Sequence, residues 1–245
     1  MSKSRSRKRK SEKQGFDKTI KKCNDSKIKV CNNSKINVNL KEENIENIQR
    51  NQNGELIFPD HPDFLPNRSP KEVLQAGAFG GGYFRKIKSG VTNEWHTDAW
   101  KEFPEDWFDG LKLSLHVANP TYDKLVNKYK VKCGLSLEGW ESYGWIKRQD
   151  PFGWFQWYCR FYLGRRTVDD TRQISRWKKF LARFKANLVN KINRANAKYN
   201  DYTISPVIRQ ALLHWGYEVT PTDVENGKVV KKSELKTSNF SHILL

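Results

Sequence analysis

The longest periodic pattern in the chain lies between residues 167 and 200. Apolar residues recur there at steps of three or four, the spacing of one buried helix face: Ile174, Trp177, Leu181, Phe184, Leu188, Ile192 and Ala195. The opposite face carries a second set at the same steps: Arg172, Arg176, Lys179, Arg183, Asn187, Asn190 and Arg194. Thr167 and Asp170 have the spacing of a capping box, so we expect one continuous helix that begins there. No acidic residue occurs between Asp170 and Asp201, which predicts a basic helix face without acidic partners on the same helix.

The segment before this helix, from Pro151 to Arg166, is dominated by aromatic residues: PFGWFQWYCRFYLGRR. Asp150 and Pro151 suit the N-cap and first position of a helix, and Gly164 suits its end. A helix that is apolar nearly all round is buried, so we expect these rings to form the core and not a platform on which bases stack. One or two rings, such as those of Trp145 or Tyr162, could still reach a ligand.

Three shorter helices are predicted at residues 69–77, 120–134 and 205–216. The first has Ser69 as its N-cap, followed by a proline at the first helical position and a glutamate that completes a capping box. The last has Ser205 before a proline, and a glycine at its end. The last helix and the basic helix resemble a helix-turn-helix. A helix that starts with Pro-Val-Ile reads base edges poorly, however, so we expect any groove contact to come from the basic helix.

These patterns predict a mainly α fold, with an α+β fold containing a little strand as the alternative. We expect a disordered basic arm at residues 1–54, one globular helical domain at residues 55–220 and a C-terminal tail at residues 221–245. The arm is rich in Lys, Asn and Ser and poor in aromatic residues. Such a segment cannot bury enough apolar area to offset its chain entropy. The proline-rich stretch at residues 55–66 reads as an extended lead-in that packs on the domain.

The net charge of the 245 residues is +18, and two segments hold the surplus. Residues 1–50 carry a net charge of +9 and residues 151–200 carry +10, whereas the other segments are close to neutral. This surplus indicates an anionic partner, nucleic acid first and an anionic membrane second; the third alternative is a solvated face. The RKRK run at Arg7–Lys10 suits nuclear import, a nucleic-acid arm or a tail that keeps the protein soluble.

Other residues that carry chemistry form weaker patterns. Three glycines in FGGGYFRKI, at Phe79–Ile87, suggest a phosphate loop, but no Lys-Ser/Thr pair follows, so we favour a turn that passes close to a neighbour. Four cysteines form no C-x-x-C pair and predict neither zinc nor a disulfide framework. The only acidic cluster near a histidine surrounds a predicted helix start at Pro104 and includes His96, Asp98, Glu105 and Asp106. It is the candidate catalytic set of an enzyme, or else a solvated surface.

Long motifs in the second half of the chain support a resemblance. DPFGWFQWYCRFYLGRR, DTRQISRWKKFLARFKANL and ISPVIRQALLHWGYEV, with the upstream Phe79–Arg85, resemble an uncharacterised family found in fungi, algae and large DNA viruses. The resemblance spans residues 76–220. The chain departs from it at Gly82, where it implies a larger residue. Because that family has no established activity, the resemblance implies no catalytic residue and no cofactor. The Asn-, Lys- and Ile-rich arm suggests an AT-rich genome and thus a large DNA virus.

We therefore expect a non-catalytic protein that binds DNA or RNA without marked sequence preference. The expected phosphate contacts are Arg165, Arg166, Arg172, Arg176, Lys179, Arg183 and Arg194. The alternatives are a nucleic-acid-processing enzyme that uses the His96 cluster and a structural or packaging protein of a virion. We expect no metal, cofactor, small-molecule ligand or membrane span. The expected location is the nucleus, a cytoplasmic viral factory or the virion, and the absence of an apolar leader argues against secretion.

Overall fold

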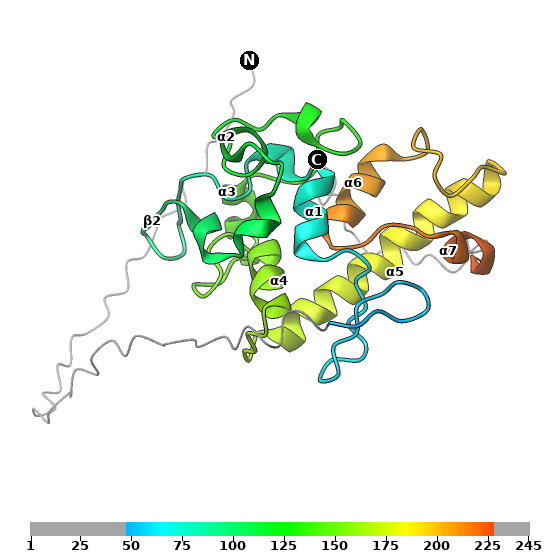
Figure 1. Cartoon of the computed structure of the whole chain (residues 1–245), viewed down its shortest axis with the longest axis horizontal. Coiled ribbons are helices and arrows are strands. Elements are labelled where there is room, and N and C mark those ends of the chain that lie inside the picture. The colour runs from blue at the N-terminus through cyan, green and yellow to red at the C-terminus, as the bar shows by residue number, and fades with distance from the viewer. Residues whose placement is uncertain (1–47, 228–245) are drawn as a thin grey trace, which may run out of the picture. The chain divides into compact units, whose positions relative to one another are not determined.

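Short helices connected by long loops make up most of the computed structural model, which describes residues 48–227 (Figure 1). The α-helices are α1 (Pro70–Ala76), α2 (Leu113–His116), α3 (Leu137–Ser142), α4 (Trp154–Tyr162), α5 (Asp170–Arg194), α6 (Pro206–His214) and α7 (Pro221–Asn226). The 3-10 turns are η2 (Phe79–Gly81), η3 (Ala99–Glu102), η4 (Glu105–Phe108) and η5 (Lys124–Val126). One antiparallel hairpin pairs β1 (Ile87–Lys88) with β2 (Trp95–His96). The mainly α prediction is confirmed.

The aromatic segment forms the centre of the core. In α4 the side chains of Trp154, Phe155, Trp157, Tyr158, Cys159 and Phe161 are all buried. Few faces of these rings are left for a ligand, because they pack on one another and on the rings of neighbouring segments. The prediction that this segment forms core is confirmed.

Phe64, in the extended lead-in, is the residue on which the rings converge. It is fully buried, and its ring centroid lies between 5.0 and 6.2 Å from those of Phe58, Trp154, Trp157, Tyr158, Phe161 and Trp177. Most of these neighbours meet Phe64 edge to face, the arrangement that aromatic rings prefer. The lead-in is thus part of the core and joins α4 to α5.

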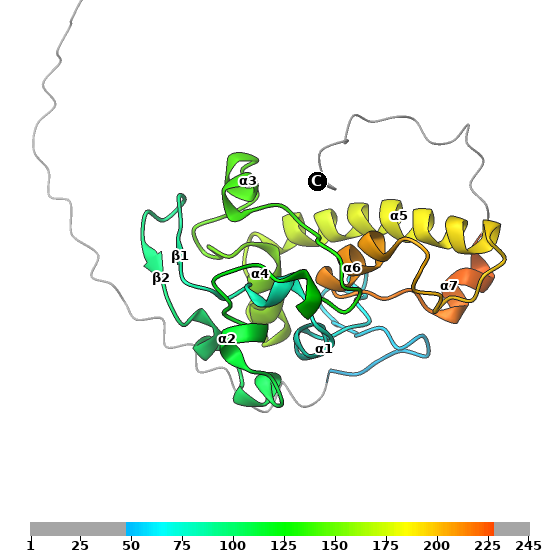
Figure 2. The same ribbon diagram turned by 90° about the horizontal axis from the view of Figure 1, so that it is seen from above.

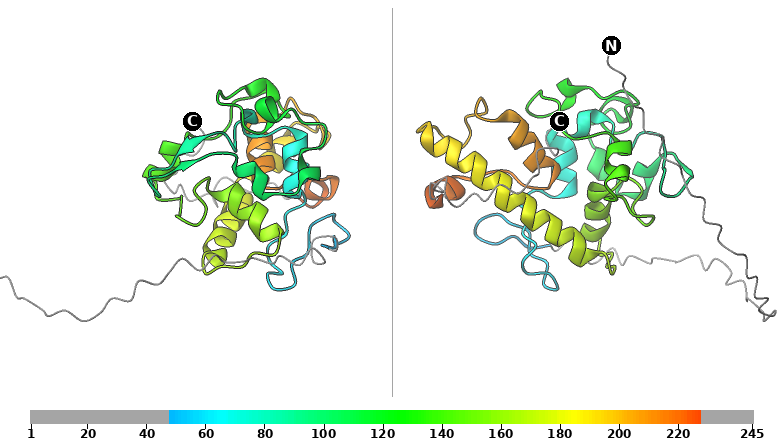
Figure 3. Two further views of the ribbon diagram at one scale, coloured as in Figure 1. Left: turned by 60° about the vertical axis from the view of Figure 1, so that its left-hand side comes forward. Right: turned by 180° about the vertical axis from the view of Figure 1, so that it is seen from behind.

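Helix α5 packs along one side only. Its residues Ile174, Trp177, Leu181, Phe184, Leu188 and Ile192 are buried, as the period of the sequence predicts. Figure 2 shows α6 and α7 along the same side of α5, and Figure 3 shows α4 at its N-terminal end. A stack of three rings fixes this arrangement: Trp215 lies 4.4 Å from Trp154 of α4 and 4.6 Å from Phe180 of α5.

The start of α5 differs in detail from the predicted capping box. The carboxylate of Asp170 accepts the backbone N–H of Thr167, as in that motif. The Thr167 hydroxyl, however, accepts from the N–H of Asp169 and not from that of Asp170. Asp170 is buried because its carboxylate also accepts the indole N–H of Trp157, at 2.8 Å. Helix α5 thus begins at Asp170, later than the predicted capping box implies, and the Asp170 side chain ties this start to the preceding turn and to α4.

Helix α1 starts as predicted, whereas α4 differs from the prediction in its start and α6 in its cap. Helix α1 has the predicted capping box, with reciprocal bonds between Ser69 and Glu72. Helix α4 begins at Trp154 and not at Pro151, because residues 150–153 form a turn closed by the bond from Gly153 N to Asp150 O. Helix α6 has its predicted start, but Ser205 has a left-handed backbone and its side chain makes no cap.

The prediction of a helix after Pro120 is wrong. Only the turn η5 forms there, because the backbone and side chains of this segment bond to other parts of the chain. Lys128 donates its N–H to Gly77 O, and the Asn127 side chain accepts from Gly80 N while donating to Val131 O. The bonds to Gly77 and Gly80, with the local side-chain bond to Val131, replace the i to i−4 backbone bonds of a helix.

The described structure extends beyond the predicted domain boundaries at both ends. Arg50 pairs with Leu56 in a β-bridge, within what we assigned to the arm. Helix α7 lies within the predicted tail and packs on α5, where Asp223 bonds to Lys185 and to the hydroxyl of Tyr217. The RKRK run and most of the predicted arm and tail lie outside the described residues. Among residues 48–227, no helix combines the length and apolar character needed to cross a membrane.

Replacing the convergent ring tests this view of the core. We expect Phe64→Ala to lower the free energy of unfolding by about 3–5 kcal/mol, because it leaves a cavity among rings that cannot easily collapse. Urea unfolding followed by tryptophan fluorescence measures the change. Val168→Ala is the control, since Val168 is fully exposed, and it should change stability by less than about 0.5 kcal/mol. A loss below about 1 kcal/mol in Phe64→Ala would show that the lead-in is dispensable.

Candidate nucleic-acid interface

Arg165 and Arg166, predicted as phosphate contacts, are held in ion pairs. The carboxylate of Asp150 is 1% exposed and accepts from Arg165 at 2.7 Å and from Arg160 at 2.9 Å. Arg166 pairs with Asp60 at 2.5 Å, and its guanidinium lies 3.8 Å from the ring of Phe161. The Arg166 guanidinium also lowers the pKa of Asp60. These two arginines hold the link between α4 and α5, so their assignment as phosphate contacts is withdrawn.

Two arginines of the basic set on α5 are also engaged within the protein. Arg172 makes two bonds to Asp169, at 2.5 and 2.7 Å. Arg176 bonds to Gln173 at 2.8 Å and lies about equally far from the rings of Trp145 and Trp215, at 5.5 and 5.6 Å. Burial lowers the pKa of Arg176 to about 10. Both side chains would have to give up these contacts to reach a phosphate, so we also remove them from the interface.

The remaining three predicted contacts are exposed and free of carboxylates. Lys179, Arg183 and Arg194 form no ion pair with any residue that the structure describes, and Arg183 rests only on the ring of Phe184. Lys191, which flanks the predicted set, is exposed as well and donates to the Ser205 hydroxyl at 3.1 Å. We call these four residues the outer face of α5. From Lys179 to Arg194 this face extends for about 22 Å at the rise of an α-helix.

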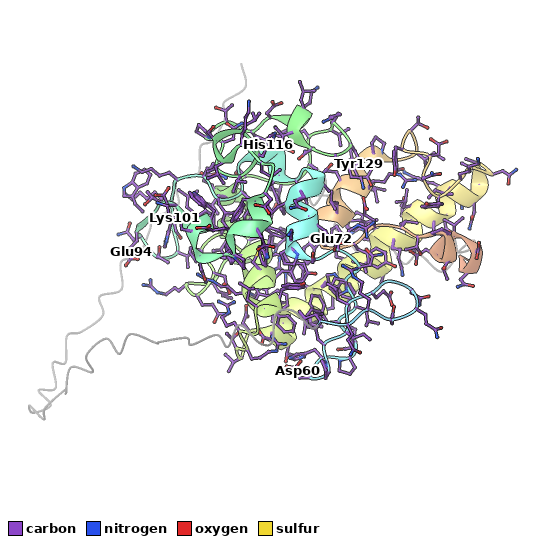
Figure 4. All side chains as sticks on the ribbon, in the orientation of Figure 1. Asp60, Glu72, Glu94, Lys101, His116 and Tyr129 are labelled. Carbon is purple, nitrogen blue, oxygen red and sulfur yellow. The ribbon has the colours of Figure 1, made fainter. Side chains whose placement is uncertain are left out.

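One flank of α5 differs from its outer face because carboxylates from other segments neutralise it. Lys178 pairs with Asp63 at 2.5 Å, and Lys185 pairs with Asp223 at 3.1 Å. Asp60 and Asp63 lie on the lead-in segment near the start of α5, where Figure 4 labels Asp60. The unpaired positive charge is thus limited to one strip on the solvent side of the helix.

The acidic cluster near His96 is not gathered into a site. His96 bonds to Thr92 on the same hairpin at 2.9 Å, and Asp98 pairs with Lys101. Asp106 instead pairs with Lys71 of α1, and Glu105 is exposed on η4. Figure 4 marks these separate regions with Lys101 and with Glu72 of α1. Within residues 48–227, no three His, Cys, Asp or Glu side chains lie close enough together to hold a metal ion.

The glycine-rich segment is a tight turn, as its sequence predicts. A Cβ atom on Gly81 would lie 2.0 Å from the carbonyl oxygen of Leu115, so only glycine fits this approach. Its N–H groups are already used: Phe79 donates to His214 Nε2, Gly80 to Asn127 and Gly81 to Ala78 O. No row of free N–H groups is left to cradle a phosphate.

His214 is the buried residue that this turn depends on. Its ring accepts the N–H of Phe79 at 2.9 Å and stacks on the Phe79 ring at 4.1 Å. Burial lowers the pKa of His214 to about 3, so the imidazole is neutral at physiological pH. Because Nε2 accepts a hydrogen bond, the ring proton lies on Nδ1. His214 Nε2 also lies 3.1 Å from Nε2 of Gln210. This histidine therefore serves the packing of the turn.

The lowered pKa of His214 predicts a loss of stability in mild acid. Below its ordinary pKa of 6.5 the unfolded chain takes up a proton that the folded His214 does not, so stability falls as the pH falls. Between pH 7.5 and pH 5 this residue should cost about 2 kcal/mol of unfolding free energy. In His214→Gln, whose amide oxygen still accepts the Phe79 N–H, that part of the pH dependence should vanish. Urea unfolding at both pH values tests this, and an equal loss in the two proteins would contradict it.

Comparison of the chain with protein-family models, with curated proteins and with solved structures finds no match. The resemblance to a family of fungi, algae and large DNA viruses therefore stays a prediction from the motifs.

Proposed function

We propose that the protein binds nucleic acid through its phosphates, without marked sequence preference, along the outer face of α5. The observation that carries the proposal is a strip of four exposed cations over about 22 Å that no described carboxylate neutralises. A strip of one sign repels itself, and an anionic polymer relieves that repulsion. Lysines and arginines that replace the counterions of a phosphate backbone gain affinity from the release of those ions.

The orientation of α5 favours nucleic acid over an anionic membrane. A basic helix that lies on a membrane buries its apolar side in the lipid. In α5 that side is occupied by the protein core: Trp177 and Leu188 are buried, the Trp177 ring meets that of Phe64 edge to face, and α6 packs on the helix. Only the polar side remains for a partner, and phosphate contacts of this kind carry no sequence information.

The salt dependence of binding tests the proposal. If the four cations each contact a phosphate, they contribute about −3.6 to the slope of log affinity against log salt on duplex DNA. The variant Lys179→Gln/Arg183→Gln should reduce the size of the slope by about 1.8, because two contacts are lost. Fluorescence anisotropy of the full-length protein on a mixed-sequence duplex, at several salt concentrations, measures both slopes.

The control variant is Lys124→Gln/Lys132→Gln, which removes the same charge from exposed positions outside α5. It should leave the slope unchanged, and any contribution from residues 1–47 is common to all three proteins. Circular dichroism checks that each variant is folded. Equal slopes for the α5 variant and the control, or binding that ignores salt, would refute the assignment to α5.

A further inference from the structure

A pocket of about 330 Å³ lies where several segments that are distant along the chain meet. It is bordered by the residues near Arg50, by Arg68 and by Lys128, and it is closed by the loop between α5 and α6 and by Arg209 of α6. Figure 4 labels Tyr129, a lining residue that lies beside α6. The volume is at the lower end of the range for small-molecule sites, which suits one ligand of modest size.

The charges that line the pocket are strongly unequal. Arg50, Arg68, Lys128 and Arg209 contribute four cations, whereas Glu218 is the only carboxylate in the lining. The Glu218 carboxylate forms ion pairs with Arg68, at 2.8 Å, and with Lys128, and it accepts a hydrogen bond from the Tyr129 hydroxyl at 2.8 Å. Arg50 has its own partner, Glu72, at 2.6 Å. Arg209 is the cation without a carboxylate partner among the described residues.

Arg209 is held rigidly with one edge of its guanidinium open. The residue is only 4% exposed. Its Nε donates to Ile204 O at 3.0 Å, and its Nη2 donates to the carbonyl oxygens of Tyr199 and Asp201. Its Nη1 makes no hydrogen bond within residues 48–227 and is not a fully buried atom, and Arg209 is among the residues that line the pocket. A charge that is buried without a counter-ion gains more from an anionic ligand than an exposed charge does.

Two exposed tyrosines stand beside this open guanidinium. Tyr199 is 39% exposed and Tyr202 is 52% exposed, although both are large aromatic residues. The Tyr202 ring lies 5.5 Å from the Arg209 guanidinium and 5.4 Å from the ring of Tyr129, which hold it in place. Aromatic faces fixed next to a cation suit a ligand that carries both a flat ring and a negative charge.

We propose that this pocket binds a nucleotide, with its phosphate on Arg209 and its base against Tyr199 and Tyr202. The nucleotide is either free or the phosphorylated end of a nucleic-acid strand, since both present the same chemistry. None of the four cations of the outer face of α5 lines the pocket, so this inference does not rest on the proposed function.

Isothermal titration calorimetry on the full-length protein tests the pocket with defined probes: AMP, adenosine, inorganic phosphate, and a short oligonucleotide with or without a 5′-phosphate. AMP should bind more tightly than adenosine or inorganic phosphate, because only AMP offers both groups. Tyr202→Ala should weaken AMP binding by about 5- to 150-fold, the range for loss of one base–aromatic stack. Tyr143→Ala is the matched control, since Tyr143 is 51% exposed and lies outside the pocket.

A second variant tests the phosphate contact. Arg209→Gln, if folded by circular dichroism, should weaken AMP binding by about 10- to 150-fold, as expected for loss of a hydrogen bond to a charged group. A gain from the 5′-phosphate on the oligonucleotide that is lost in Arg209→Gln identifies a strand end as the ligand, whereas binding of AMP alone identifies a free nucleotide. Absence of saturable AMP binding, or AMP binding unchanged in Tyr202→Ala, overturns the inference. Neither result affects the salt slope assigned to α5.

Discussion

Burial of the apolar side of α5 against the aromatic core is the constraint on which the other features depend. Trp177 meets Phe64 edge to face, and Phe180 stacks on Trp215, which in turn stacks on Trp154 of α4. The indole N–H of Trp177 also donates to Trp215 O at 2.9 Å. These contacts fix the rotation of the helix about its axis. Residues half a turn away, such as Lys179 and Arg183, must therefore face solvent.

Ion pairs then decide which cations of this region remain available. Arginines near the N-terminal end of α5 serve the structure: Arg165 shares the buried Asp150 with Arg160, and Arg172 bonds to the residue that precedes the helix. Towards the C-terminal end the described carboxylates neutralise only the flank, through Asp223. The available positive charge is thus shifted towards the second half of α5, close to the loop that borders the pocket around Arg209.

Capping residues and the period of apolar residues predicted the helices that depend on them. The capping residues Ser69 and Glu72 locate α1, and the steps of three and four locate the buried side of α5. Features that depend on distant residues could not be read in this way. The segment after Pro120 has a helix-like composition, yet Asn127 and Lys128 bond to the glycine-rich turn about 50 residues earlier. Likewise, Ser205 has the identity of a cap but a left-handed backbone, and its hydroxyl accepts from Lys191.

The candidate site was predicted only in part, because it also depends on residues that are distant in the sequence. The identity of a basic face follows from the helical period, but the acids that pair with Arg165, Arg166 and Lys178 lie 15, 106 and 115 residues away along the chain. No local pattern predicts such partners, so a reading of the sequence alone overestimates the free charge. The pocket around Arg209 was missed because its lining is drawn from several segments that are far apart in the sequence. Its one local signal is the pair of tyrosines in the loop after the basic helix.

Lysine reactivity measured residue by residue tests the central claim most directly. The protein, alone and with saturating duplex DNA, is treated briefly with an acetylating reagent, and the modification of each lysine is quantified by mass spectrometry. On the outer face of α5, Lys179 and Lys191 should lose reactivity when DNA is bound, while Lys124 and Lys132 keep theirs. Unchanged reactivity of Lys179 and Lys191 in a protein that is demonstrably bound to DNA would contradict the account.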